Sequence, residues 1–153
     1  MNVFLGLGSN LGDRNANLNN ALTMLRKLPK TKVLKISGFY DTEPAGYREQ
    51  NRFLNAAIQI NTQLTPRQLL EKTQAIEKKL GRQPIFKWGP RIIDIDILAY
   101  DSKIIDKEDL HIPHLELSSR SFVLEPLCEI APEAVEARSK KTYRQLLDTL
   151  LCK

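Results

Sequence analysis

The feature that most constrains the fold of this chain is a hydrophobic period that switches between about two and about 3.6 residues. Val3, Leu5 and Leu7 alternate with other residues, which predicts a first strand, and apolar side chains recur at helical spacing over 18–28. The same reasoning predicts, in chain order, strands 32–40 and 53–60, a helix at about 65–80, a strand 92–100, and helical segments at about 118–130 and 142–151. Strand and helix periods therefore alternate within one short chain.

The helix at 65–80 has the clearest end signals. Thr65 suits the N-cap, Pro66 suits the first helical position, and Gln68 completes a capping box. Gly81 is placed to end the helix, because glycine accepts the left-handed backbone that follows many helices. The buried face of this helix is predicted to carry Leu69, Thr73, Ile76 and Leu80.

The predicted order of elements is strand, helix, strand, strand, helix, strand, followed by a helical tail. That order is the split βαβ arrangement of a ferredoxin-like α+β fold, βαββαβ, in which both helices cover one face of an antiparallel sheet. We expect the other face to be open and the tail to form a C-terminal helical extension. At 153 residues the chain fits one compact domain, which we expect to span 1–153.

Composition restricts the class of protein further. Apolar residues make up 42% of the chain, yet no run reaches the roughly 18 apolar residues of a membrane-spanning helix. Met1 to Gly12 lacks the charged start and long apolar centre of a signal peptide. Cys128 and Cys152 stand alone, so we expect free thiols and a cytoplasmic location. The net charge of +5 could reflect binding to nucleic acid, binding to an anionic small molecule, or solubility alone. The charge is spread evenly along the chain, which weakens the case for nucleic-acid binding.

Alternation along the strands sorts the side chains between the two faces of the sheet. The apolar sets, expected to face the helices, are Leu54, Ala56, Ile58 and Ile60 on one strand and Ile93, Ile95, Ile97 and Ala99 on another. The open face is then expected to carry Phe53 and Asn55, and Ile92, Asp94, Asp96, Leu98 and Tyr100. Aspartate is a poor strand former, and two carboxylates on one strand face repel each other unless a cation lies between them. Carboxylates with water and phosphate suit magnesium; an exposed strand face whose acids pair with arginine or lysine is the alternative.

Residues near the two aspartates fit a phosphate ligand, although each also has a structural alternative. Arg91 can grip phosphate through its planar fork of donors, or it can form a surface ion pair. Trp88 can be a buried anchor. His114 can bind a phosphate oxygen or be structural, and Phe122 can stack on a flat ring or belong to the core. The glycine-rich segment 6–12 matches neither a dinucleotide fingerprint nor a P-loop, and we interpret its first two glycines as letting something lie close to the backbone.

Taken together, these motifs resemble the 6-hydroxymethyl-7,8-dihydropterin pyrophosphokinase family. The most specific of them is Trp88-Gly-Pro-Arg-Ile-Ile-Asp-Ile-Asp96. It is joined, in order along nearly the whole chain, by Leu7-Gly-Ser-Asn-Leu11, Phe53-Leu-Asn-Ala-Ala57, Ile112-Pro-His114, Glu125-Pro-Leu and Glu129-Ile-Ala-Pro132. The resemblance implies a ferredoxin-like fold, in agreement with the order of elements. It also implies an enzyme of folate biosynthesis that transfers the pyrophosphoryl group of ATP to the pterin hydroxymethyl oxygen and leaves AMP.

The resemblance further implies roles for individual side chains. The carboxylates that hold two magnesium ions on ATP would be Asp94 and Asp96, with Arg82 and Arg91 as their partners in catalysis. The residues matching the triphosphate site are Arg82, Arg91, His114 and Arg120, and those matching the nucleotide site or its covering loop are Gln74, Glu77, Trp88 and Ile97. The pterin pocket would be formed by Thr42, Phe53, Asn55 and Phe122, with the two rings on either side of the pterin. Any contact of Ile97 is expected to use its backbone.

Some positions depart from the family pattern: Glu43, Ala45, Phe53, Leu115 and the short segment 83–87. They bear on nucleotide affinity and on the loops at about 43–52 and 82–91, which we expect to close over ATP and exclude water. They do not bear on the reaction.

Two functions of other classes stay open at this point. An RNA-binding module on the same fold would need exposed aromatic and basic side chains on the open face, where this chain has acids that repel phosphate unless a metal is present. A regulatory domain could hold a nucleotide without turnover. The presence of both catalytic pairs, Asp94 with Asp96 and Arg82 with Arg91, argues against that function. We expect small-molecule substrates, ATP and a reduced pterin alcohol, with neither nucleic acid nor membrane as partner. The sequence allows a monomer and does not define the oligomeric state.

Overall fold

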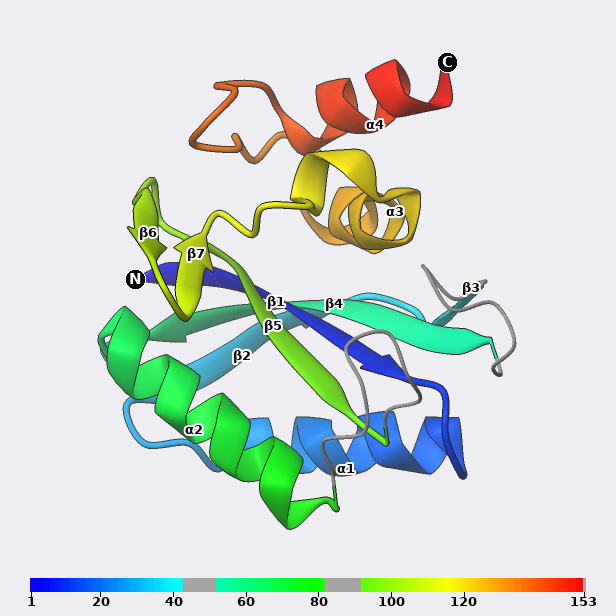
Figure 1. The fold of residues 1–153 in the computed structure, drawn as a ribbon, viewed down its shortest axis with the longest axis vertical. Coiled ribbons are helices and arrows are strands. Elements are labelled where there is room, and N and C mark those ends of the chain that lie inside the picture. Colours follow the sequence, from blue (N-terminus) through cyan, green and yellow to red (C-terminus); the bar gives the residue numbers. More distant parts are fainter. Residues whose placement is uncertain (43–51, 82–91, 153) are drawn as a thin grey trace.

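The computed structural model describes residues 1–42, 52–81 and 92–152, which form a central sheet with helices on both sides (Figure 1). In chain order the elements are β1 (Asn2–Ser9), α1 (Arg14–Arg26), β2 (Thr31–Ile36), β3 (Tyr40–Thr42), β4 (Phe53–Thr62), α2 (Pro66–Lys79), β5 (Asp94–Tyr100), β6 (Ile105–Lys107), β7 (Leu110–Ile112), the 3-10 turn η1 (Leu117–Ser119), α3 (Ser121–Ile130) and α4 (Tyr143–Leu151). Within these ranges, every helix is too short or too polar to span a membrane.

The main sheet has the strand order β2-β4-β1-β5, with β3 beside β4, and every pair is antiparallel. The first strand is therefore central, as the βαββαβ prediction requires. The predicted strand 32–40 is divided into β2 and β3 at Ser37. There the Ser37 hydroxyl, rather than a strand carbonyl, accepts the hydrogen bond from the N–H of Ala57 (2.8 Å). The hairpin of β6 and β7 is a separate two-stranded sheet that the sequence analysis did not predict.

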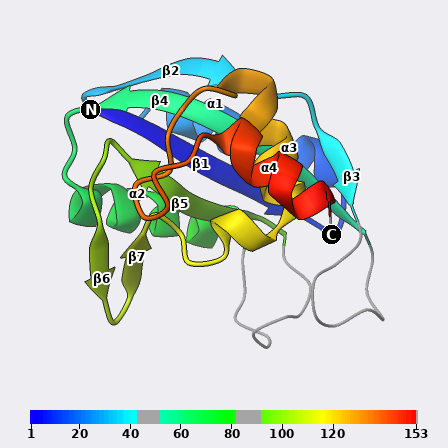
Figure 2. The same cartoon turned by 90° about the horizontal axis from the view of Figure 1, so that it is seen from above.

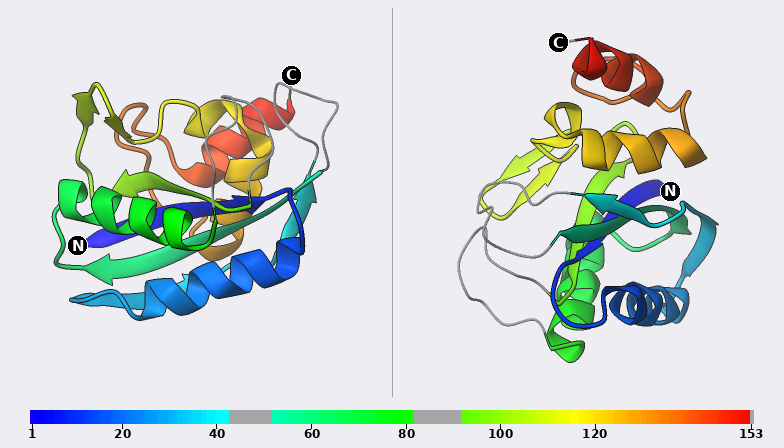
Figure 3. Two further views of the ribbon diagram at one scale, coloured as in Figure 1. Left: turned by 60° about the horizontal axis from the view of Figure 1, so that its bottom comes forward. Right: turned by 90° about the vertical axis from the view of Figure 1, so that its right-hand side faces the viewer.

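The face of the sheet under α1 and α2 carries the larger core, as predicted, and both helices lie on this side (Figure 3). Buried side chains from the sheet and both helices meet there: Leu5, Leu18, Leu25, Ile58, Ile60, Leu69, Ile76, Ile93 and Ile95. The predicted capping box of Thr65 and Gln68 is present. Gly81 takes a left-handed φ of 95° directly after the C-cap residue Leu80. Both predicted ends of α2 are therefore confirmed.

The opposite face of the sheet is only partly open. The predicted C-terminal extension folds over it as a second helical layer, with α3 next to the sheet and α4 beyond α3 (Figures 1 and 2). A second core forms between them, and the Tyr143 ring of α4 meets the Phe4 ring of β1 edge to face, with centroids 5.5 Å apart. The expectation of a wholly open face was wrong in this half, because an amphipathic tail buries its apolar stripe on the nearest apolar surface.

A bulge in β5 changes which side chains face each core. Leu5 of β1 pairs with Ile97, but the preceding residue Phe4 pairs with Ala99, so Leu98 is an extra residue in the ladder. The alternation reverses after the bulge. Ala99 therefore packs in the core with α3 and α4, and Tyr100 enters the core with α1 and α2. The predicted faces of Ala99 and Tyr100 were wrong, because simple alternation assumes an uninterrupted ladder.

Candidate active site

On the face that also carries α3, polar side chains of β5 and β4 lie in one row, on either side of two glycines of β1. Gly8 of β1 lies opposite both Asp94 of β5 and Asn55 of β4, and Gly6 lies opposite Asp96. Residues paired across an antiparallel sheet lie on the same face. Neighbouring strands lie about 4.8 Å apart, so the backbones of Asp94 and Asn55 are about 10 Å apart. The predicted shared face of the aspartates and Asn55 is confirmed by this register.

The two glycines of β1 make room for their neighbours across the sheet. A Cβ atom on Gly8 would lie 2.9 Å from Asn55 Oδ1 and 3.5 Å from Cδ1 of Phe53. A Cβ atom on Gly6 would lie 3.3 Å from a methyl carbon of Leu98. We predicted that these glycines let something lie close to the backbone, and the structure shows neighbouring side chains there. A side chain at Gly8 would therefore force the Asn55 side chain to shift.

The predicted pterin residues lie at the β3–β4 edge of this row and on α3. Thr42 and Phe53 are paired across β3 and β4, and Asn55 Nδ2 donates a hydrogen bond to Thr42 Oγ1 (2.5 Å). Phe53 and Phe122 are both half-buried, and neither belongs to the two apolar cores of the described residues. The Arg120 guanidinium lies over the Phe122 ring, 5.4 Å from the ring centroid. These rings are therefore placed differently from the core aromatics Phe4 and Tyr143.

His114 is held in one orientation and one tautomer. Its backbone N–H donates to the Leu98 carbonyl at the β5 bulge (2.9 Å), and its Nδ1 accepts from the backbone N–H of Glu116 (3.2 Å). Burial lowers the pKa of His114; the charge of Arg120 acts in the same direction, whereas Glu116 and Asp94 act against it. A neutral imidazole that accepts at Nδ1 carries its proton on Nε2. His114 therefore offers one N–H donor in a region that it shares with Arg120 and Asp94.

Arg120 lies at the N-cap of α3, where it forms an ion pair with Glu116 one turn earlier in the chain. Its side chain is mostly buried, at 19% exposure. A mostly buried guanidinium next to a helix start is a suitable anion contact. The structure thus brings His114 and Arg120 together, as predicted for the triphosphate residues.

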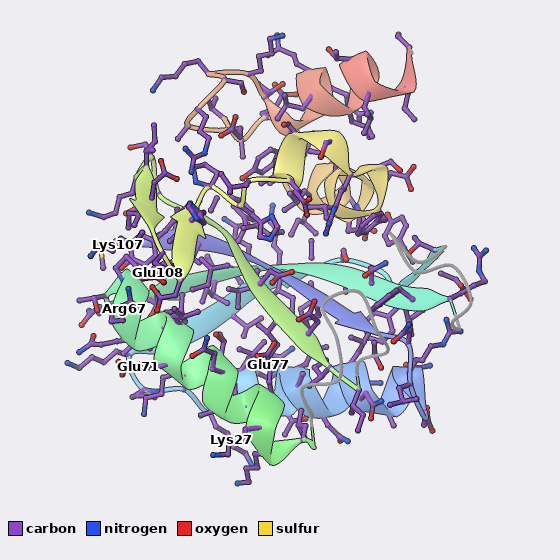
Figure 4. All side chains as sticks on the ribbon, viewed as in Figure 1. Lys27, Arg67, Glu71, Glu77, Lys107 and Glu108 are labelled. Atoms are coloured by element: carbon purple, nitrogen blue, oxygen red, sulfur yellow. The ribbon has the colours of Figure 1, made fainter. Side chains whose placement is uncertain are left out.

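The nucleotide residues predicted on α2 and β5 are placed less uniformly. Glu77 is 5% exposed, and its Oε2 accepts from the backbone N–H of Ile95 (2.8 Å), which ties α2 to the edge strand β5 (Figure 4). The Ile97 side chain is buried in the core with α1 and α2, so a ligand can meet only its backbone. Gln74 lies exposed on α2. The predicted roles of these residues in nucleotide binding stay predictions.

Some predicted site residues lie outside the described part of the chain. Arg82, Trp88 and Arg91 belong to 82–91, and two of the departures from the family pattern, Glu43 and Ala45, belong to 43–51. The closing loops predicted at about 43–52 and 82–91 also fall there, apart from Arg52.

The donor set at Asp94 and Asp96 fits magnesium better than a metal held by protein alone. In the part of the chain that the structure describes, no three His, Cys, Asp or Glu side chains gather as a metal cage. Magnesium is commonly bound by one or two carboxylates together with water and substrate phosphates. Two half-buried carboxylates on one strand face, with His114 and Arg120 nearby, match that pattern.

Sequence reasoning assigned no role to Glu129, which fastens α3 to the strand beside the pterin residues. Its carboxylate accepts from the Gly38 N–H (3.0 Å) and from the Tyr40 hydroxyl (2.6 Å). The hydrogen bond to Glu129 raises the pKa of Tyr40 to about 12. Tyr40 pairs with Asn55 across β3 and β4. The sequence feature that could have pointed to Glu129 was its place in the motif Glu129-Ile-Ala-Pro132.

Comparison with known sequences gives matches along nearly the whole chain. The profile of the family described as 7,8-dihydro-6-hydroxymethylpterin-pyrophosphokinase (HPPK) matches residues 4–132. A Bacillus subtilis protein named 2-amino-4-hydroxy-6-hydroxymethyldihydropteridine pyrophosphokinase is 44% identical over 144 residues, which cover 94% of this chain and 86% of that protein. A protein of the same name from Methylorubrum extorquens is 48% identical over 133 residues, which cover 87% of this chain and 84% of that protein. Folic acid synthesis protein fol1 of Schizosaccharomyces pombe is 40% identical over 148 residues, 97% of this chain but 20% of that protein.

Solved structures show the same fold at low sequence identity. The crystal structure of Plasmodium falciparum HPPK-DHPS wild type with SDX-DHP matches with a TM-score of 0.74 at 19% identity, over 99% of this chain and 44% of that chain. A structure of HPPK-DHPS in complex with substrates matches with a TM-score of 0.72 at 15% identity, over 97% of this chain and 43% of that chain. This chain therefore spans less than half of those two-part proteins.

Proposed function

Because this chain belongs to the 7,8-dihydro-6-hydroxymethylpterin-pyrophosphokinase family, we propose that it transfers the pyrophosphoryl group of ATP to the hydroxymethyl oxygen of 6-hydroxymethyl-7,8-dihydropterin and leaves AMP. The observation that carries this proposal is the row Asp94, Gly8, Asn55 across three strands. It puts carboxylates suited to a metal-bound triphosphate about 10 Å from a polar amide beside an aromatic ring. A nucleotide and a flat heterocycle can meet over such a row.

We assign the binding of two magnesium ions to Asp94 and Asp96. When bound, the ions would offset negative charge on the triphosphate and on the departing AMP. The two carboxylates would fix the triphosphate relative to the sheet. Phosphoryl chemistry of this kind depends on positioning and charge rather than on a protein nucleophile, so no general base is assigned.

The remaining phosphate contacts are assigned to cations and one neutral donor. His114 would donate from Nε2 to a phosphate oxygen, since its Nδ1 is already an acceptor. Arg120 would contact the same triphosphate from the start of α3. Arg82 and Arg91 would steady the transferred phosphates as the partners of the aspartates in catalysis. We also assign to the nucleotide site Gln74, Glu77, Trp88 and the backbone of Ile97.

The pterin is assigned to the β3–β4 edge and α3. Phe53 and Phe122 would stack on its two faces, because aromatic rings outside the cores gain from a flat partner. Asn55 Nδ2 donates to Thr42, which leaves Oδ1 as an acceptor for the amino and ring N–H groups of the pterin.

We further propose that 1–153 acts as one pyrophosphokinase domain with small-molecule substrates, in the cytoplasm. The two thiols, buried at Cys128 and exposed at Cys152, are unbonded and are compatible with a reducing compartment. We also propose that the protein can act as a monomer, since one chain supplies the whole row of Asp94, Gly8 and Asn55.

The test is the fate of the label when ATP labelled at the γ-phosphate is incubated with magnesium and the reduced pterin alcohol. Transfer of the pyrophosphoryl group gives labelled pterin diphosphate and unlabelled AMP. Formation of ADP and a pterin monophosphate contradicts the mechanism, and label released as free phosphate indicates an ATPase. Nucleotide binding without product supports a regulatory domain, and salt-sensitive RNA binding without magnesium supports an RNA-binding module.

A further inference from the structure

A charged cluster behind His114 has no part in the proposed function. The Arg138 guanidinium, in the segment between α3 and α4, forms a two-point ion pair with Asp106 of β6 (2.6 and 3.0 Å). The same guanidinium donates to two consecutive main-chain carbonyls, those of Pro113 (3.1 Å) and Ile112 (3.3 Å). It therefore joins three separate parts of the chain at the residue before His114.

Arg138 is presented by a turn that its neighbour Glu136 fixes from inside. The Glu136 side chain is 4% exposed, and its carboxylate accepts from the backbone N–H groups of Arg138 (2.7 Å) and Ser139 (2.8 Å). The Lys140 N–H returns to the Glu136 carbonyl (2.9 Å). A charged acceptor with two backbone donors holds such a turn in one shape. The direction from which Arg138 approaches the carbonyls is thereby set.

The two carbonyls belong to the segment that places His114. The N–H of His114 is already bonded to the Leu98 carbonyl at the β5 bulge (2.9 Å), which fixes the segment on its sheet side. The Pro113 carbonyl belongs to the same peptide group as this N–H, and the Ile112 carbonyl belongs to the peptide group before it. Arg138 binds both carbonyls from the side of the hairpin and the C-terminal layer. The imidazole thus projects from a backbone that is bonded on both sides.

We infer that Arg138 and Asp106 are positioning residues for ATP, acting through His114: they hold the two peptide groups on either side of Pro113 so that His114 Nε2 meets the triphosphate. This inference rests on the proposed role of His114 in ATP binding. The planar fork of arginine is essential to it, because one guanidinium must serve a carboxylate and two carbonyls at once. Lysine would keep the charge and lose that geometry.

The same hairpin offers a matched control pair. Arg67 of α2 forms a two-point ion pair with Asp109 at the turn between β6 and β7 (2.5 and 3.0 Å). Figure 4 shows Arg67 near Lys107 and Glu108 at this corner of the molecule. Arg67→Ala removes an arginine–aspartate pair from the hairpin without touching the carbonyls at 112 and 113. His111→Gln serves as a second control, because it removes the contact of His111 Nδ1 with Asp106 Oδ1 (3.0 Å) and keeps both hydrogen bonds from Arg138 to this carboxylate.

The experiment measures binding of a non-hydrolysable ATP analogue with magnesium by calorimetry, and KM for ATP and for the pterin by turnover. Arg138→Ala and Asp106→Ala are expected to weaken analogue binding and raise KM for ATP about three- to tenfold, with KM for the pterin unchanged. Arg138→Lys should weaken analogue binding and raise KM for ATP nearly as much as Arg138→Ala does. Arg67→Ala and His111→Gln should match the wild type. Circular dichroism and thermal melting of each variant identify any general loss of structure.

A double-mutant cycle decides whether the effect passes through His114. In a His114→Ala background, Arg138→Ala should change analogue binding by less than about twofold, because the side chain that it positions is gone. Equal losses in both backgrounds, no loss in either, or a loss matched by Arg67→Ala would overturn the inference, as would an unchanged affinity in His114→Ala alone. The binding measurement needs no turnover, so a chain that binds ATP without making pterin diphosphate would contradict the proposed function and still decide this inference.

Discussion

The two faces of the central sheet are built from alternate residues of the same strands, yet they differ in nearly every property. On the side of α1 and α2, Leu5, Ile58 and Ile95 are almost fully buried in one continuous apolar core. On the other side, one part of the surface packs under α3 and α4, and another part carries the row of Asp94 and Asn55. The first face stabilises the sheet. The second can then keep charged side chains that a core would not accept.

The largest expected effect comes from removing the carboxylates of the second face. Asp94→Ala and Asp96→Ala should each abolish detectable turnover, a loss of at least about 10³-fold, because each removes charge and ligands needed to hold the metal-bound triphosphate. Thermal stability without ligand should be unchanged or slightly higher, since the change leaves no core cavity and relieves repulsion. Steady-state kinetics and thermal melting measure the two quantities. A large drop in melting temperature with activity retained would assign both aspartates to structure.

A substitution in the apolar core of the first face should have the opposite effect, with stability lost and activity kept. Ile58 of β4 is fully buried, and Ile58→Ala should lower the free energy of unfolding by about 2–5 kcal/mol through lost burial and a residual cavity. Well below its melting temperature, the variant should keep KM values close to those of the wild type. Denaturant unfolding gives the free energy. Loss of turnover in a fully folded Ile58→Ala protein would show that the two faces are not separable.

The third effect concerns the boundary between the second core and the row. Phe122→Ala should raise KM for the pterin about three- to tenfold, the equivalent of one stacking contact, and leave KM for ATP nearly unchanged. Leu124→Ala, two residues later on α3 and fully buried, is the control and should cost stability instead. Equal losses for both substrates, or unfolding of Phe122→Ala, would place Phe122 in the core.

Much of this comparison could be predicted from the sequence, because strand alternation and helix caps are local signals. Thr65 and Gly81 define the ends of α2, and alternation places Asp94 and Asp96 on one face. The bulge at Leu98 could not be predicted in this way, since nothing in β5 alone tells how Phe4 and Leu5 pair with it. Local periodicity therefore separates the faces only up to the first irregularity in the ladder.

The parts of the site that were missed depend on long-range pairing. The covering of one face by α3 and α4 required knowing which apolar surface the tail would meet. The hydrogen bond between Thr42 and Asn55 depends on the β3–β4 register, and the contacts of Arg138 join residues 25 to 32 positions apart. No local pattern encodes such contacts. Family resemblance gave roles to Thr42 and Asn55, but it gave none to Arg138.

The smallest expected effect lies where α3 is fastened to the sheet, and it tests whether the two halves of the second face are linked. The hydrogen bond to Glu129 raises the pKa of Tyr40 from the ordinary 10.0 to about 12, and partial burial and the nearby carboxylate charge add to it. Because the folded pKa is the higher one, this bond stabilises the fold fully below pH 10.0 and loses that effect as pH rises toward about 12.

In Glu129→Gln the neutral amide still accepts a hydrogen bond, but the charge is gone, so the pKa of Tyr40 should fall toward its ordinary value. The tyrosinate absorbance of each protein, minus that of the same protein carrying Tyr40→Phe, isolates this group from Tyr100 and Tyr143, whose pKa values burial also raises. If α3 depends on this link to place Phe122, Glu129→Gln should also weaken pterin binding slightly, by less than about threefold. A midpoint for Tyr40 that does not move would show that burial, rather than Glu129, sets its titration. Unchanged pterin binding in Glu129→Gln would show that the charge of Glu129 contributes nothing to the site.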